Sequence, residues 1–112
     1  MTRYAASFEE YVDIIATESP HAAIMDWWCR LNLALDHYFE ELGERRGDAI
    51  EVERHIASDP RLGPDVAAML RELRLKRNAV AHENVGPLSR EVAIRYAEDA
   101  FQLIQALTER RS

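Results

Sequence analysis

The side chains best suited to chemistry stand within one hexapeptide, RNAVAH, at residues 77–82. The guanidinium of Arg77 can hold phosphate oxygens in a bidentate fork and stabilise negative charge that develops in a transition state. An imidazole is the one common side chain that titrates near neutrality in an ordinary environment, so His82 is suited to moving the proton of a hydroxyl. Asn78 can both donate and accept a hydrogen bond. Together these three side chains suit phosphate chemistry that needs no metal ion.

A basic patch overlaps the start of this hexapeptide. Residues 71–77 contain four basic side chains and one acid, whereas the whole 112-residue chain carries a net charge of −6. An acidic protein has no general attraction for nucleic acid, so any RNA contact must be made where basic residues cluster. The basic residues that accompany Arg77 in this patch are Arg71, Arg74 and Lys76.

Arg77 occupies an unusual position on the helix that the apolar pattern predicts. One side of this helix carries Val66, Leu70, Leu73 and Arg77, so a guanidinium stands on the apolar stripe. An unpaired guanidinium in a core is costly, so the stripe must meet an acidic partner, a solvent-filled groove or a second subunit at this level. The alternative is that the stem of Arg77 packs while its charged end reaches water near the end of the helix.

Caps and breakers divide the chain into five expected helices. Ser-x-x-Glu and Asp-x-x-Glu capping boxes begin two of them, prolines begin two more, and a serine caps the last. Their approximate ranges are residues 7–19, 20–42, 48–57, 64–82 and 89–109. No segment shows the alternation of a strand, and no linker interrupts the chain. The sequence therefore predicts an all-α, up-and-down helical bundle of four to five helices, formed by residues 1–112 as a single domain.

Metal sites, cofactor sites and membrane segments have no signal in this sequence. His21, His37 and His55 lack the spacing of metal ligands, and no glycine-rich phosphate loop occurs, so we expect neither a metal nor a cofactor. There is no charged-then-apolar leader and no run of about 18 apolar residues, so no membrane span is expected. The single cysteine, Cys29, cannot form an intrachain disulfide. These features favour a cytoplasmic protein.

Four further side chains are assigned by their place on the helices. The stripe of residues 20–42 predicts that Trp28 lies in the core and Trp27 at an interface. Cys29, inside the same apolar stretch, is interpreted as a core residue. Tyr96 falls on the apolar stripe of the last helix, and we expect it to be buried with its hydroxyl tethered to a partner.

The segment LRLKRNAVAHE, residues 73–83, resembles the signature of the HEPN superfamily, an arginine followed four to six residues later by a histidine. The asparagine directly after the arginine strengthens the match, and the order of the expected helices agrees with it. The resemblance implies a homodimer that cleaves RNA without a metal and leaves a cyclic phosphate. Arg77 would bind the scissile phosphate, His82 would be the acid or base, and Asn78 would orient the phosphate or the histidine. The basic residues Arg71, Arg74 and Lys76 would follow the RNA backbone.

The resemblance leaves the activity open between an enzyme and a binding module. HEPN toxins that pair with a nucleotidyltransferase antitoxin commonly carry a tyrosine two residues after the histidine, where this chain has Asn84. Many members also have an acidic residue on the long second helix, at about the position of Asn32. We therefore expect either a toxin-like or defence-like ribonuclease held in check by an antitoxin or regulatory protein, or a non-catalytic RNA-binding or dimerisation module. A third alternative is a helical scaffold in which Arg77 and His82 only satisfy backbone carbonyls.

Overall fold

The computed structural model of this chain describes residues 19–82 and 88–109, which form four helices and no strand. The helices are α2 (Pro20–Leu42), α3 (Ala49–Ser58), α4 (Gly63–Ala81) and α5 (Arg90–Glu109). Their bounds agree with the predicted ranges to within one or two residues, so the prediction of an all-α helical bundle is confirmed. The helix expected at residues 7–19 and the side chain of Asn84 lie outside the described residues.

The long helix α2 begins and ends at the signals that its sequence carries. The Ser19 hydroxyl accepts a hydrogen bond from the backbone amide of Ala22 at 3.1 Å, and Pro20 follows at the first helical position. Gly43 ends the helix with a φ of 70°, a left-handed conformation that glycine adopts without steric cost.

The short helix α3 is stabilised at its start by the predicted capping box. The Asp48 carboxylate accepts a hydrogen bond from the Glu51 amide at 2.9 Å, and the Glu51 carboxylate accepts one from the Asp48 amide. The other end of α3 is tied to α2, because the Tyr38 hydroxyl donates a 2.6 Å hydrogen bond to the Asp59 carboxylate.

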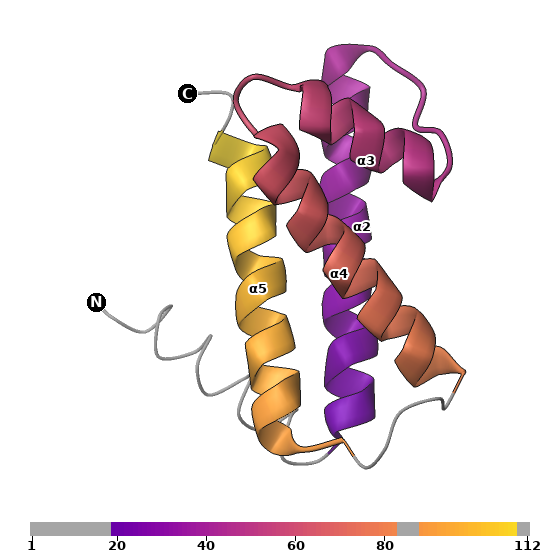
Figure 1. Ribbon diagram of the computed structural model, residues 1–112, viewed down its shortest axis with the longest axis vertical. Coiled ribbons are helices and arrows are strands. Elements are labelled where there is room, and N and C mark those ends of the chain that lie inside the picture. Colours follow the sequence, from indigo (N-terminus) through magenta and orange to yellow (C-terminus); the bar gives the residue numbers. More distant parts are fainter. Residues whose placement is uncertain (1–18, 83–87, 110–112) are drawn as a thin grey trace.

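Three long helices form the frame of the bundle (Figure 1). Helices α2 and α5 run side by side in the same direction, α4 runs back across them, and α3 packs against the first half of α4. The second half of α4 therefore extends beyond α3, where α2 lies behind it. The buried core contains Ala23, Ile24, Trp27, Leu31, Leu35, Tyr38, Phe39, Val52, Ile56, Ala67, Leu70, Leu73, Val80, Ala93, Tyr96, Ala97, Ala100, Leu103 and Leu107.

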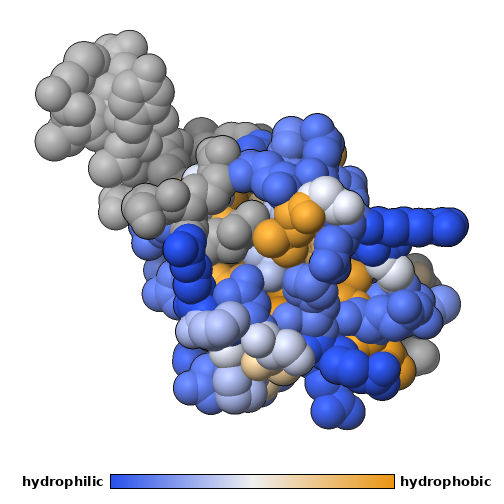
Figure 2. Space-filling view, turned by 90° about the horizontal axis from the view of Figure 1, so that it is seen from above, coloured by the Kyte–Doolittle hydropathy of each residue, from blue (hydrophilic) through white to orange (hydrophobic). Residues whose placement is uncertain are grey.

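Polar side chains make up most of the surface at one end of the bundle (Figure 2). Seen from the end where α2 and α5 finish, hydrophobic side chains reach the surface only in patches between polar ones (Figure 2). The large apolar side chains exposed in the described part of the chain are Leu33, Leu42, Ile50 and Leu75. None of its helices combines the length and the apolar character needed to cross a membrane.

Three of the residue assignments on α2 are wrong. Trp27 is buried and meets Phe101 of α5 edge to face at 6.3 Å between ring centroids, whereas Trp28 is only half-buried. The periodicity placed Trp28 nearer the centre of the stripe, but α5 packs on the side of α2 that carries Trp27. Cys29 is exposed rather than in the core, because it lies about 100° further round the helix than Trp28.

Candidate functional site

Arg77 stands in the last two turns of α4, between two buried apolar side chains. On the same side of the helix, Leu73 precedes it and Val80 follows it, with 4% and 1% of their surfaces exposed. Arg77 itself is half-buried. The sequence-based inference that a guanidinium interrupts the apolar stripe is therefore confirmed.

Three features define the environment of the Arg77 guanidinium. Its Nη1 atom donates a hydrogen bond to Oδ1 of Asn78 at 2.9 Å. Its central carbon lies 5.5 Å from the ring centroid of Trp28, within the range of a cation–π contact. Its Nε atom is buried and has no hydrogen-bond partner among the described residues. A buried N–H without an acceptor is uncommon in folded proteins, because it loses its hydration without compensation.

No carboxylate pairs with Arg77 in the described part of the chain. Arg74, one turn earlier on α4, provides the contrast, since it donates two hydrogen bonds to Glu53 of α3 at 2.6 and 3.3 Å. The hydrogen bond to Glu53 raises the pKa of the Arg74 guanidinium, against a smaller opposing effect of burial. The charge of Arg74 is thus neutralised locally, and that of Arg77 is not.

His82 caps the C-terminal end of α4 and its side chain is exposed. Its backbone amide donates to the carbonyl oxygen of Asn78 at 3.0 Å. Five residues along an α-helix correspond to a rotation of about 140°, so Arg77 and His82 project to different sides of α4 within one protomer. The structure therefore brings Arg77 and Asn78 together, and no hydrogen bond joins the side chains of His82 and Arg77 in the part of the chain that it describes.

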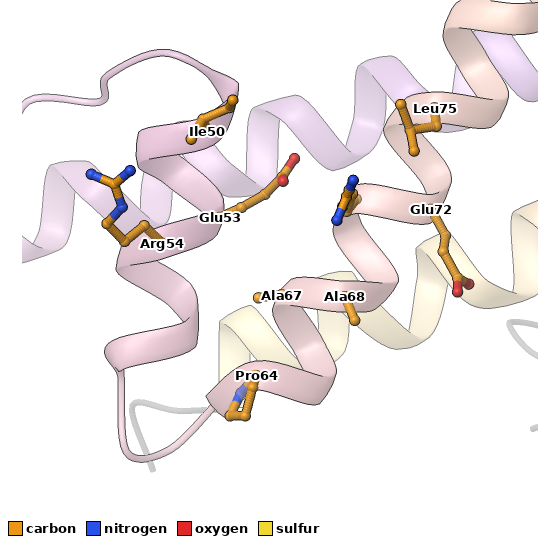
Figure 3. A pocket seen from close by; sticks show the side chains of 9 residues that line it. Ile50, Glu53, Arg54, Pro64, Ala67, Ala68, Glu72 and Leu75 are labelled. Carbon is orange, nitrogen blue, oxygen red and sulfur yellow. The ribbon is translucent and has the colours of Figure 1, made fainter.

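The basic patch is divided among different sides of α4. Arg71 is one of the residues that line an open groove between α3 and α4. The exposed side chains of Ile50 and Leu75 line the same groove (Figure 3). Lys76 borders a second groove, between α4 and α5, together with Asp99. With Arg74 held by Glu53, the four basic side chains do not form one continuous surface.

A polar network borders Trp28 on α2. The Asn32 side chain donates to the Trp28 carbonyl at 2.8 Å and accepts a hydrogen bond from Arg46, which also pairs with Asp36 at 2.6 Å. Asn32 thus holds the segment between α2 and α3. Sequence reasoning missed Arg46, because nothing local indicates that this loop folds back on α2.

Tyr96 ties α5 to α4 one turn before Arg77. It is 2% exposed, and its hydroxyl donates a 3.0 Å hydrogen bond to the Leu73 carbonyl, as the sequence predicted. Burial raises the pKa of Tyr96 well above its usual range, while the positive charge of Arg77 opposes that rise. This hydrogen bond between helices fixes the position of α5 along the part of α4 that carries the candidate site.

We expect the Tyr96→Phe variant to be less sensitive to alkaline pH than the wild type. The folded state holds the phenolic proton that the unfolded state releases, so the wild type loses stability as the pH rises past about 10. At neutral pH the variant is less stable by about 1 kcal/mol, because the hydrogen bond to Leu73 is lost. Urea unfolding between about pH 8 and pH 11 should show the two stabilities converging. Parallel curves would contradict this account.

Metal ligands do not gather at this site. The described residues contain no group of three or more histidine, cysteine, aspartate or glutamate side chains placed to hold a metal ion. The chemistry that the arrangement can perform from its own side chains is anion binding by Arg77 and proton transfer by His82. No protein-family model, no curated protein and no solved structure matches this chain.

Proposed function

We propose that this protein is a HEPN-type, metal-independent endoribonuclease that acts as a homodimer. The observation that carries the proposal is Arg77, a half-buried guanidinium on the apolar side of α4 with no carboxylate partner among the described residues. A charge kept uncompensated at such a position destabilises the fold, which is typical of residues retained for a ligand. The neighbouring Asn78 and the exposed His82 supply the other groups that phosphate chemistry needs.

The proposed reaction is transesterification within RNA. A base removes the proton of a ribose 2′-hydroxyl, the 2′-oxygen bonds to the adjacent phosphorus, and the bond from phosphorus to the 5′-oxygen breaks. The leaving 5′-oxygen takes up a proton, and the products end in a cyclic phosphate and a 5′-hydroxyl. Arg77 stabilises the charge on the phosphate oxygens, His82 transfers one of the protons, and Asn78 orients Arg77.

The geometry of α4 supports a homodimer as part of this proposal. Because Arg77 and His82 project about 140° apart in one protomer, a single copy does not present both to one phosphate. A twofold axis beside the end of α4 would place Arg77 of one protomer opposite His82 of its partner. In this proposal the enzyme works in the cytoplasm as a toxin-like or defence-like effector, restrained by an antitoxin or another regulatory protein.

The direct test is cleavage of RNA in the presence of excess chelator. We expect the purified wild-type protein to elute as a dimer and to cut a labelled RNA into fragments with cyclic-phosphate ends when EDTA is present. Mass spectrometry of the fragments identifies those ends, and light scattering gives the oligomeric state. Intact RNA after prolonged incubation with a mixture of substrates of different sequence and structure would refute the proposal.

The second candidate is a non-catalytic HEPN-like module that binds RNA or a nucleotide, or that only dimerises. It is favoured by the division of the basic patch, since Arg71 and Lys76 line separate grooves and Arg74 is paired. This candidate predicts a mobility shift or thermal stabilisation with RNA but no fragments. The same experiment therefore separates the two functions.

A further inference from the structure

The indole ring of Trp28 lies against the guanidinium of Arg77. Trp28 projects from α2 and is half-buried, with its ring packed against the hydrophobic core. The distance of 5.5 Å between the Arg77 central carbon and the ring centroid corresponds to a contact between a cation and the negative face of an aromatic ring. The contact joins two helices that are far apart in the sequence. No local pattern around Trp28 or Arg77 predicts it.

The backbone that carries Trp28 is held in place. The Trp28 carbonyl accepts the 2.8 Å hydrogen bond from Asn32, and Asn32 is held in turn by Arg46. The neighbouring Trp27 is anchored in the core against Phe101, which fixes the rotation of α2 at this level. Trp28 therefore stands on a fixed part of α2, and its ring packs against the core beside Arg77.

Among the described residues, the guanidinium stacks on one neutral group and donates a hydrogen bond to another. The indole face of Trp28 and the carboxamide of Asn78 restrict its orientation but leave its full positive charge available. A carboxylate would also fix a guanidinium, as Glu53 fixes Arg74, but it would cancel the charge that a phosphate must meet. Neutral contacts thus fix the orientation of the guanidinium and also leave its charge free for a phosphate. An ion pair fixes the orientation but neutralises the charge.

We infer that Trp28 is a positioning residue for Arg77, holding the guanidinium in the orientation in which it meets a phosphate group. This inference rests on the proposed function, which supplies the phosphate. The orientation matters because a guanidinium that is already in place stabilises the transition state without a further loss of side-chain entropy. A mobile guanidinium would first have to be ordered, which lowers its contribution to the rate. Trp28 does not itself touch the reacting atoms in this account.

Steady-state cleavage kinetics give the first test. We expect Trp28→Leu to lower kcat by roughly tenfold to a hundredfold with KM changed by less than about threefold, and Trp28→Phe to retain most of the activity. Leu33→Ala, at an exposed position on the same helix, is the matched control and should behave as wild type. Trp28→Met, whose unbranched and flexible side chain adapts to the space left by the indole, replaces the leucine variant if the latter does not fold.

Hydrogen exchange of the arginine Nε–H groups, followed by NMR, gives a test that needs no activity. The Arg77 Nε–H should exchange slowly in the wild type and at least about tenfold faster in Trp28→Leu or Trp28→Met. The Arg74 Nε–H, held by Glu53, is the internal reference and should not change. Unchanged Arg77 exchange, or unchanged kcat in an active enzyme, would overturn the inference. Faster exchange in a protein that cleaves no RNA would retain the positioning role and reject the proposed function.

Discussion

Replacing Arg77 with methionine is expected to reduce RNA cleavage by at least about 10²-fold to 10³-fold while leaving the free energy of unfolding within about 1 kcal/mol of wild type. The substitution removes the group proposed to stabilise charge on the phosphate. It also removes a buried Nε–H that has no acceptor among the described residues, which offsets the lost contacts with Trp28 and Asn78. Function and stability should therefore respond very differently at this position.

Arg74→Met is the matched control for this prediction, since it makes the same substitution one turn away. It leaves the Glu53 carboxylate, only 14% exposed at its side chain, without its partner. We expect Arg74→Met to lower the free energy of unfolding by about 2 kcal/mol. This is less than the cost of breaking a fully buried ion pair, because both side chains keep some contact with water. Urea unfolding measures both variants, and cleavage assays at a temperature where both are folded measure activity. Strong destabilisation by Arg77→Met with cleavage retained would favour the scaffold alternative.

His82→Ala is expected to lower kcat by roughly 10²-fold to 10⁴-fold with no measurable change in stability. The side chain is exposed at the end of α4, and the hydrogen bond made by its backbone amide persists in the variant. Cleavage kinetics together with thermal unfolding check both parts of this expectation. Full activity in the variant would remove His82 from the proposed mechanism.

Mixing Arg77→Met with His82→Ala protomers tests how the site is assembled. If Arg77 of one protomer works with His82 of the other, each mixed dimer contains one intact site, and random exchange restores about a quarter of the wild-type activity. If both side chains act within one protomer, no mixed dimer contains an intact site and the mixture stays inactive. The rotation of about 140° between the two positions on α4 favours recovery.

Local sequence patterns predicted the helices and the position of Arg77 on the apolar stripe of α4. The cap at Asp48, the stop at Gly43 and the spacing of apolar residues act within a few positions along the chain, so they determine where helices begin, end and face. The same spacing placed Arg77 on the apolar side of α4 and Tyr96 in the core. The family resemblance and the ribonuclease activity stay predictions.

The contacts of these residues depended on how the helices pack. Periodicity could not tell which flank of α2 would meet α5, so it exchanged the roles of Trp27 and Trp28. Whether Arg77 or Arg74 would find a carboxylate depended on how far α3 extends along α4, because Glu53 of α3 pairs with Arg74, while Trp28 of α2 lies against Arg77 one turn later. The sequence by itself determined that a guanidinium interrupts the stripe. Only the tertiary structure decided that a neutral indole, not an acid, faces it, because rotation and contact between distant helices are set by the packing of the whole core.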